Sequence, residues 1–448
     1  IRSLVRSRGL GDVYKRQRGG RLGVRVLVLS HYWYPENGVP QRRWTWLSEI
    51  LKNAGHEVTV IAPPPHYKRS IPLREWFASG GFKPTLETER GPSGEAILRS
   101  SYFPSGSSLT QRIFNQGWSA VGMVLALSKL SSQSRRFRPD IVIGTVPALP
   151  TAAVSYLAAK KFSVPYVIDL RDAWPALFKE SGSWNAGTGT PSLRERLLKR
   201  GPFQLLVFCT EAMIEGVLSQ ASGIITTSSE LESAVSKQHQ VPTATVRNVF
   251  PSPAFQRRRR TTHPGELNVL YAGTLGRAQR LENALHAAKI AQERGVQVNL
   301  RFVGDGATWD ALIEQASALE IDLQIEHQLS PEALNSCYDW ADTALVHLTD
   351  WESLDAAVPS KTYELMSNSI HISGVVRGET ARIIAELEAG DVVSPNDPPA
   401  LAELWVALST DRSRLEVSDK GRRWVEMQRQ HAAPHALVGL LENVTEAP

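Results

Sequence analysis

The sequence contains very few cysteines, with only Cys209 and Cys337 among its 448 residues. Two thiols so far apart exclude a disulfide framework, and both lie in segments that we expect to be apolar and buried. A charged-then-apolar leader of the secretory type is absent, so a reducing cytoplasm is the simplest compartment. Long apolar runs are absent as well, because the longest, at residues 120–127, is far shorter than the roughly 20 residues of a membrane-spanning helix. Any contact with a membrane is therefore expected to be peripheral.

Excess charge is also scarce once the start of the chain is set aside. The formal net charge is +5 and the sequence pI is about 9.1. Residues 1–17 resemble translated adapter sequence and carry a net four of these positive charges, and we predict that residues 1–22 form a non-native or disordered tail. The remaining charge, roughly +1, does not favour a nucleic-acid partner. No clustered Asp-x-Asp or His/Cys pattern is present, so no metal site is expected.

Two successive series of buried-type strands alternate with helical segments, which is the pattern of α/β domains with parallel sheets. The first series is expected at residues 25–30, 56–62, 139–145, 166–170 and 223–227, with helices such as 41–54 and 152–161 between the strands. The second series is expected at residues 268–272, 299–303, 323–327, 344–347 and 371–375. Residues 63–108 are rich in proline, glycine and aromatic residues and are interpreted as an irregular insertion over the strand ends.

Breaks in this periodicity divide the chain into domains. Prolines and an arginine run mark residues 251–265 as a linker, and a solvated charge cluster explains that run better than anionic lipid does. Residues 23–250 and 266–425 are then two tandem Rossmann-like domains of the α/β class, followed by a helical segment at residues 426–448. Ligands of such sheets lie beyond the carboxyl ends of the strands. We therefore expect the binding site in a cleft between the two domains.

The segment at residues 356–366 is typical of a helix start suited to a phosphate group. Pro359 ends the preceding extended run and Ser360 can cap the helix, whose first-turn amides are then available to an anion. Lys361 adds a full positive charge, and Glu364 can accept hydrogen bonds from two neighbouring ribose hydroxyls. An ordinary capped helix explains the same residues, because a glutamate near a helix start is favoured by about 0.3 to 1 kcal/mol.

This segment resembles the second half of the glutamate, seven residues, glutamate motif of family 4 of the retaining glycosyltransferases, whose order the chain follows from Val24 onward. The resemblance is closest to the bacterial branch that builds O-antigen, capsule and other envelope polysaccharides and carries a similar Pro-Ser-Lys-x-x-Glu. It implies the GT-B architecture, with the segment at residues 426–448 crossing back to the first domain. One departure is Ala356, where the family has its first glutamate. The usual contact to the donor sugar is then absent, or is supplied by Asp355, Glu352 or the backbone.

A glycine-bearing turn follows the first strand of the second domain. Gly273 and Gly276 let backbone amides approach a diphosphate closely, and Arg277 can clamp phosphate oxygens with two hydrogen bonds. Turn geometry alone is the commoner explanation of such glycines. The wider family has arginine and lysine where this chain has Thr274 and Gln279, whereas the envelope branch often has a similar Gly-Arg-Ala-Gln. Phosphate binding is therefore carried over to Arg277, with Gln279 as a weaker candidate.

The resemblance extends to the other strand ends of the second domain. A Gly-Asp-Gly run resembles a family turn, and its Asp305 is expected to cap the following helix. His327 and Gln328 close the next strand, where relatives recognise the nucleobase through backbone groups, so a uracil contact is expected there. The donor-binding residues that the resemblance implies are Gly38, Gly273, Arg277, Gln279, His327, Gln328, Ser360, Lys361, Thr362 and Glu364.

In the first domain, Arg171 and Asp172 stand just past a strand end, in an Arg-Asp-Ala-Trp-Pro run similar to that of the envelope branch; many other relatives have histidine in place of the arginine. Arg171 can bind acceptor phosphate or stabilise the departing diphosphate, and Asp172 can orient the acceptor or take its proton. A buried ion pair that fixes the loop is an equally good interpretation. Candidates for an acceptor pocket, each also explained by surface solvation, are Arg42, Arg43, Arg99 and Arg112.

The resemblance implies transfer of a sugar from a nucleotide sugar, expected to be UDP-linked, to a lipid-linked or saccharide hydroxyl with retention of configuration. Its catalytic candidates are Arg171, Asp172, Lys361 and Glu364, without cofactor or metal. Two alternatives stay open: a non-hydrolysing UDP-sugar epimerase, which needs no acceptor, and a catalytically silent nucleotide-sugar-binding protein. A nicotinamide-dependent oxidoreductase is disfavoured because no Gly-x-Gly-x-x-Gly follows the first strand. The expected location is the cytoplasm, with peripheral contact to the inner membrane.

Overall fold

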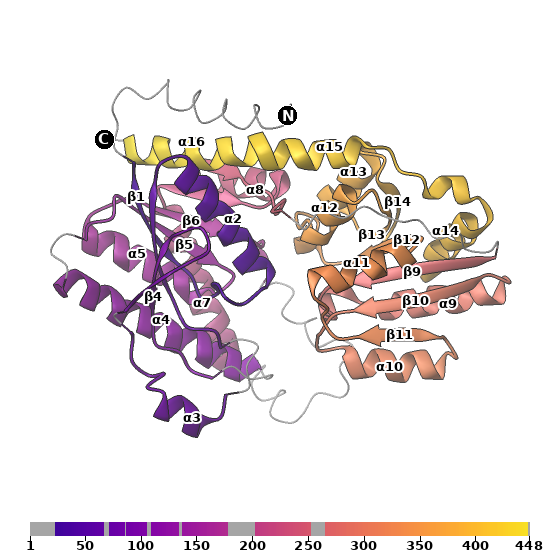
Figure 1. Ribbon diagram of the computed structural model, residues 1–448, viewed down its shortest axis with the longest axis horizontal. Coiled ribbons are helices and arrows are strands. Elements are labelled where there is room, and N and C mark those ends of the chain that lie inside the picture. The colour runs from indigo at the N-terminus through magenta and orange to yellow at the C-terminus, as the bar shows by residue number, and fades with distance from the viewer. Residues whose placement is uncertain are drawn as a thin grey trace, which may run out of the picture.

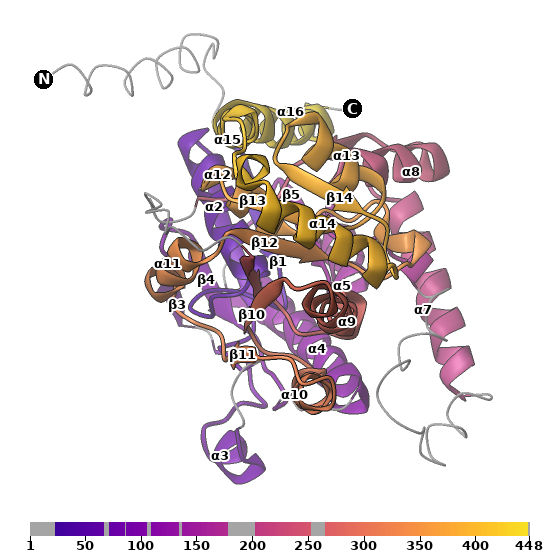
Figure 2. The same ribbon diagram turned by 90° about the vertical axis from the view of Figure 1, so that its right-hand side faces the viewer.

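The computed structural model describes residues 23–66, 71–85, 87–104, 109–133, 137–177, 202–251 and 265–446. The predictions for residues 1–22, and for most of the linker at residues 251–265, lie outside these ranges. Within them the chain forms two sheets with helices on both faces, shown from two sides in Figures 1 and 2. The two tandem Rossmann-like domains predicted from the sequence are confirmed.

The first sheet has eight strands in the order β3-β4-β2-β1-β5-β6-β7-β8. All neighbouring strands pair in parallel except β3 with β4. Because the order runs outward in both directions from β1 and β5, the carboxyl ends of these two strands flank the point where the topology reverses. The strands are β1 (Arg25–Leu29), β2 (Glu57–Ala62), β3 (Thr88–Arg90), β4 (Ala96–Arg99), β5 (Ile141–Val146), β6 (Tyr166–Leu170), β7 (Gly223–Thr226) and β8 (Thr243–Thr245).

The second sheet has six parallel strands in the order β11-β10-β9-β12-β13-β14. Its topology reverses between β9 and β12, so a ligand is expected beside the carboxyl ends of those two strands. The strands are β9 (Glu266–Ala272), β10 (Gln297–Val303), β11 (Leu323–Glu326), β12 (Thr343–His347), β13 (His371–Val375) and β14 (Gly390–Val393).

Helices cover both faces of each sheet and bury its apolar side chains (Figure 1). Those that follow strands of the first sheet are α2 (Val39–Asn53), α3 (Leu73–Ala78), α4 (Leu109–Gln133), α5 (Pro150–Phe162), α7 (Pro202–Ser219) and α8 (Ser229–His239). Those of the second half are α9 (Glu282–Glu293), α10 (Trp309–Ala318), α11 (Pro331–Trp340), α12 (Ser360–Ser367), α13 (Gly378–Glu386), α14 (Pro398–Thr410), α15 (Lys420–Met427) and α16 (Ala433–Glu446).

Two expectations about the insertion and the cysteines are wrong. Residues 63–108, interpreted as an irregular insertion, contain α3 and the strands β3 and β4, and β4 extends the sheet in parallel beside β2. Strands of three or four residues show too little alternation to be recognised in a sequence. Cys209, expected to be buried, is exposed on α7, whereas Cys337 is buried as expected.

The last helices connect the two halves. A π-helical turn at Gln428–Ala432 joins α15 to α16. Together they run along one side of the molecule (Figure 1), with α15 packed on α12 and α16 on β7 and β8. Leu440 and Val444 of α16 lie so close to Gly223 that a β-carbon there would stand 3.2 and 3.1 Å from them. The chain therefore returns to the first sheet after completing the second.

Candidate active site

Helix α12 begins directly after the extended segment that ends at Pro359. Pro359 is the N-cap, its carbonyl accepts from the amide of Thr362, and Ser360 is the first helical residue. No side chain makes a capping bond there, so the predicted capping by Ser360 is wrong. The helix nevertheless begins at the predicted place, because the fixed φ of a proline is compatible with the start of a helix.

Lys361, Glu364 and Tyr338 form a compact polar cluster on α12 and α11. Lys361 Nζ lies 3.0 Å from Glu364 Oε2 and donates to the Tyr338 hydroxyl at 3.1 Å, and that hydroxyl donates to Glu364 Oε1 at 2.7 Å. Tyr338 is almost fully buried, while the Lys361 and Glu364 side chains are 24% and 14% exposed. Lys361 and Glu364 are thus within reach of a ligand, and Tyr338 holds them from behind.

The charge of Glu364 is maintained by its neighbours. Burial acts to raise the pKa of this carboxyl, but Lys361 and the Tyr338 hydrogen bond hold the pKa below its ordinary value. Arg42, on α2 of the first half, adds to this lowering. The Arg42 guanidinium stacks on the ring of Phe250 at 4.5 Å and donates to the carbonyl of Pro251 at 3.4 Å. An ionised glutamate of this kind can accept two hydroxyl donors at once.

The turn after β9 packs very closely against the turn after β10. A β-carbon on Gly304 would lie 1.7 Å from the carbonyl oxygen of Gly273, and Gly304 has φ +155°. Only glycine fits there, so backbone packing alone requires this residue. Arg277 and Gln279 occupy a single 3-10 turn (Arg277–Gln279) whose N-cap is Gly276. Both side chains are half-buried at the carboxyl end of the first strand of the second sheet.

Asp305 does not cap the helix that follows it. Helix α10 starts at Trp309 with Thr308 as N-cap, while Asp305 Oδ1 lies 2.6 Å from His327 Nδ1 and Oδ2 accepts from the amide of Gln328 at 3.2 Å. The His327 ring stacks on Trp309 with centroids 4.3 Å apart. The predicted nucleobase contacts, His327 and Gln328, are therefore held together by one carboxylate.

On the first-domain side, Arg171 and Asp172 follow β6. Arg171 is half-buried, and its Nε and Nη1 atoms have no hydrogen-bond partner among the described residues. Burial lowers the pKa of this guanidinium, while Asp169 and Asp172 act in the opposite direction. Asp172 is exposed. Gly38 is the N-cap of α2, where its amide donates to Gln41 Oε1 at 3.1 Å.

Two of the arginines considered for an acceptor pocket are buried in internal contacts. Arg43 pairs with Asp169 at 2.8 Å, and neither side chain is exposed. Arg99 pairs with Glu89 at 2.7 Å and also donates to the carbonyls of Pro63 and Tyr34. Arg112, by contrast, is exposed on α4. Acceptor binding by Arg99 and Arg112 stays a prediction.

Loops at the carboxyl ends of both sheets meet through hydrogen bonds and ion pairs. Glu379 of α13 is fully buried and accepts from the amides of Ser229 and Glu230 at the start of α8, at 3.1 and 2.7 Å. Arg247 pairs with the same carboxylate at 2.5 Å. An acidic group at a helix start satisfies free amides and the helix dipole together. This contact between distant residues has no local signature in the sequence.

Ala356, the position that departs from the family motif, lies at this junction. Its carbonyl accepts from the Ser228 hydroxyl at 2.5 Å, and its methyl group packs against the core of the first domain. Asp355, one of the suggested substitutes, pairs with Arg377 at 3.1 Å. Glu352, the other, is exposed in the preceding turn. A larger side chain at position 356 would face the first domain.

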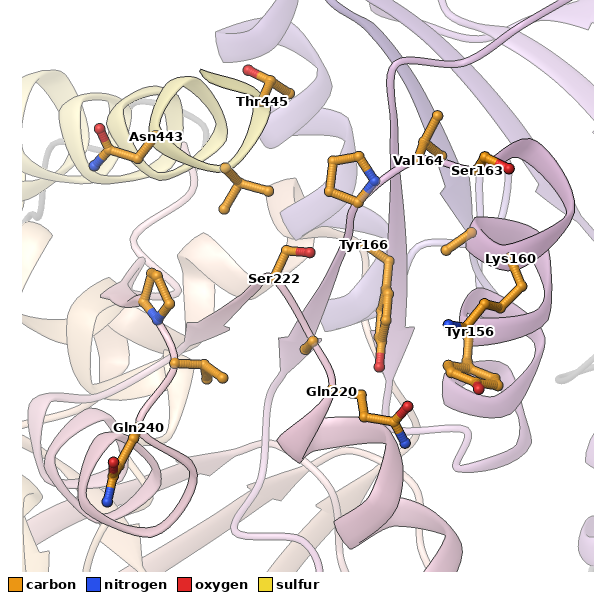
Figure 3. A pocket seen from close by; sticks show the side chains of 16 residues that line it. Tyr156, Lys160, Ser163, Val164, Tyr166, Gln220, Ser222, Gln240, Asn443 and Thr445 are labelled. Carbon is orange, nitrogen blue, oxygen red and sulfur yellow. The ribbon is translucent and has the colours of Figure 1, made fainter. Parts of the chain in front are cut away.

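The cavity of about 810 Å³ in Figure 3 lies away from all these residues. It is lined by residues that precede β6, β7 and β8, such as Val164, Ser222 and Gln240, and by the end of α16. These are the amino ends of the strands, opposite the edge where ligands of parallel sheets bind. This cavity is therefore not the candidate active site.

The described part of the chain contains neither a membrane-spanning helix nor a cluster of metal ligands. No helix there is both long enough and apolar enough to cross a membrane. No three His, Cys, Asp or Glu side chains come close enough together there to hold a metal ion.

Comparison with known proteins gives matches over both halves. Residues 38–251 match the family described as glycosyl transferase 4-like domain, and residues 254–429 match glycosyl transferases group 1. WcaI of Escherichia coli (strain K12), which bears the name of a colanic acid biosynthesis glycosyl transferase, is 25% identical over 363 residues, 77% of this chain and 81% of its own.

Two solved structures share the arrangement of both domains. The sucrose-phosphate synthase of Thermosynechococcus elongatus has a TM-score of 0.65 at 14% identity, over 94% of this chain and 98% of its own. Anabaena HepE, solved in complex with UDP and glucose, has a TM-score of 0.58 at 12% identity, over the same shares. Both halves of the chain match glycosyltransferase families, and each half is built on a mainly parallel sheet. The chain therefore belongs to family 4 of the glycosyltransferases and has the GT-B fold.

Proposed function

We propose that this protein transfers a glycosyl group from a UDP-sugar to a hydroxyl of a lipid-linked or saccharide acceptor, with retention of configuration, in the synthesis of an envelope polysaccharide. The observation that carries the proposal is the cluster of Lys361, Glu364 and Tyr338 at the start of α12. It combines a partly exposed cation, an ionised carboxylate and a buried tyrosine that contacts both. That is what binding of a diphosphate and a ribose requires.

Each part of the donor has a candidate partner in the second domain. Glu364 accepts the ribose hydroxyls, and Lys361 turns from Glu364 to the diphosphate, where Arg277 and Gln279 join it. The uracil lies near the backbone of His327 and Gln328. The backbone at Gly273, Ser360 and Thr362 approaches the diphosphate closely. Gly38 of the first domain approaches the same phosphates. The complex of Anabaena HepE with UDP and glucose supports this choice of donor.

The chemistry consists mainly of stabilising charge. The bond between the anomeric carbon and the diphosphate oxygen breaks with its electron pair going to the diphosphate, and Lys361, Arg277 and Arg171 stabilise that charge. The acceptor hydroxyl attacks from the same face of the sugar, oriented by Asp172, and its proton passes to Asp172 or to the departing phosphate. No metal, cofactor or covalent intermediate takes part in this scheme.

The acceptor is the less constrained partner. The name of the Escherichia coli relative supports an envelope polysaccharide as the product. A lipid-linked acceptor places the enzyme at the cytoplasmic face of the inner membrane as a peripheral protein. Arg112, which is exposed, is the candidate for acceptor contact, whereas Arg99 would first have to leave its internal partners.

The proposal is tested by incubating the protein with a panel of UDP-sugars and a lipid-linked saccharide. NMR of the product is expected to show the same anomeric configuration as the donor. Glu364→Gln is expected to abolish most of the transfer, whereas the exposed Glu388→Gln is expected to have no effect. An inverted product, or conversion of the nucleotide sugar without any acceptor, would contradict the proposal.

A further inference from the structure

Helix α4 presents an apolar stripe to solvent. Phe114, Val121 and Leu125 are 52%, 57% and 47% exposed, and half-buried Trp118 lies between them at a spacing of four, three and four residues. This spacing places the four side chains on one face of the helix. The opposite face supplies Met123 to the core. The helix is therefore apolar on both sides, which a helix at an ordinary water-exposed surface is not.

The charged residues of α4 and of the neighbouring α5 all have one sign. Neither α4 nor the neighbouring α5 contains an aspartate or a glutamate. Their charged residues are Arg112, Lys129, Lys160 and Lys161. Leu157 of α5 is also 52% exposed. Two adjacent helices thus combine exposed apolar side chains with positive charge only.

Helix α3 continues the apolar surface. It projects from the body of the first domain (Figures 1 and 2) and exposes Leu73 and Phe77. Stacked and edge-on rings connect it to α4, with centroid distances of 5.2 Å for Phe77–Phe82, 6.0 Å for Phe82–Trp76, 6.2 Å for Trp76–Trp118 and 6.1 Å for Trp118–Phe114. Packed aromatic rings therefore join α3 to α4, and α5 packs beside α4. The outer sides of these three helices are named the apolar helical face.

The apolar helical face lies near the acceptor side of the candidate site. Helix α3 follows the carboxyl end of β2, and α4 follows that of β4. Arg171 and Asp172 follow β6 of the same parallel sheet. Since the carboxyl ends of parallel strands share one edge, α3 and the start of α4 border the edge at which the acceptor is proposed to react.

We infer that the apolar helical face docks on an anionic lipid bilayer. Exposed aromatic and aliphatic side chains flanked by lysine and arginine are the composition that partitions into the boundary between headgroups and acyl chains. Helices α4 and α5, which contain no acidic residue, favour an anionic surface, while the exposed Arg74 and Glu75 of α3 offset each other in charge. A second copy of this chain is disfavoured, because it would bring the cations of α4 and α5 against the same cations. The inference rests on the proposed lipid-linked acceptor, which such docking brings to the site.

The test is flotation of the full chain with lipid vesicles. We expect the protein to float with vesicles of phosphatidylcholine mixed with phosphatidylglycerol, less with phosphatidylcholine alone, and less at high salt. The double variant Val121→Gln with Leu125→Gln is expected to lower the bound fraction by about tenfold. Ile313→Gln is the control, because Ile313 is also exposed, at 44%, on α10 of the other domain.

Several outcomes would overturn the inference. These are a wild-type protein that does not float with anionic vesicles, a double variant that floats as well as the wild type, and a self-associated protein that the double variant makes monomeric. The double variant is expected to keep full transfer to a water-soluble acceptor. Absence of transfer by the wild type to any acceptor, with vesicle binding intact, would instead reject the proposed function.

Discussion

The two domains use their charged residues in opposite ways at the edge where they meet. In the first domain, Arg43 and Asp169 pair at 2.8 Å with both side chains fully buried. In the second, Lys361 and Glu364 pair at 3.0 Å and both stay partly exposed. A fully buried pair cannot change partners without leaving an unpaired charge in the interior, whereas a partly exposed pair can exchange one partner for a ligand. The difference separates charges that hold the fold from charges available for binding.

The comparison also explains why arginine content alone is a poor guide to an acceptor site. Arg99 is buried against Glu89 and two backbone carbonyls. Arg171 keeps two nitrogen atoms without a hydrogen-bond partner among the described residues. Of these two arginines, Arg171 is therefore better suited to contact a ligand.

The largest effect is expected from the buried pair of the first domain. Asp169→Asn leaves the charge of Arg43 uncompensated and is expected to lower the free energy of unfolding by about 3–5 kcal/mol. Urea unfolding measures this loss. Asp140→Asn is the control, because Asp140 pairs with Arg25 at 2.7 Å on the surface and such pairs contribute less than about 1 kcal/mol. Equal losses would show that burial does not distinguish the two pairs.

Lys361→Ala is expected to reduce kcat/KM by about 10²–10³ without unfolding the protein, since a cation aimed at the leaving diphosphate is lost. Steady-state kinetics and circular dichroism measure the two effects. The exposed Lys420→Ala, in the same domain, is expected to change neither. If Asp169→Asn lowered the activity of the folded protein more than Lys361→Ala does, the buried pair and not the partly exposed pair would serve binding.

Each half of the molecule contains a buried histidine that is expected to make its stability depend on pH. Burial lowers the pKa of His31 in the first domain and of His347 in the second from 6.5 to about 3, and it also lowers the pKa of His66, whose ring centroid lies 5.1 Å from that of His31. A histidine that stays neutral when folded contributes full stability above its unfolded pKa, and that contribution falls as the pH drops toward the folded value.

Between pH 7 and 5, His31 and His347 are each expected to cost roughly 2 kcal/mol of unfolding free energy. This window lies above the range in which Glu364 and Glu379, whose pKa values are lowered, take up protons. Urea unfolding at the two pH values measures the loss, which His347→Asn should reduce by about its own share. Stability that does not change with pH would rule out neutral buried histidines.

The smallest effect is expected from Tyr338→Phe, which removes the hydroxyl that holds Glu364. UDP affinity, measured by calorimetry, is expected to fall by about five- to tenfold, because one buried hydrogen bond contributes about 1 kcal/mol. Tyr166→Phe is the matched control in the first domain, since it removes a similar bond to the carbonyl of Val217. Unchanged UDP affinity in Tyr338→Phe would mean that Lys361 alone orients Glu364.

Much of this architecture was predictable from the sequence. The strands at residues 25–29, 166–170 and 371–375 are apolar runs between turn residues, and such runs form parallel strands wherever helices cover both faces. Lys361 and Glu364 could be found because both lie within one turn of the same helix. The strands β3 and β4 were missed because they are too short to show a period.

The sequence by itself determined the two α/β domains and the donor-binding candidates that lie together on short turns, because those features depend on spacing along the chain. Only the tertiary structure decided that Tyr338 supports Glu364, that Arg43 and Arg99 are internal, and that Glu379 caps α8 across the junction. These contacts join residues far apart in the chain. Their existence depends on how buried charges and free helix amides find partners once the sheets have packed, and no local pattern records that choice.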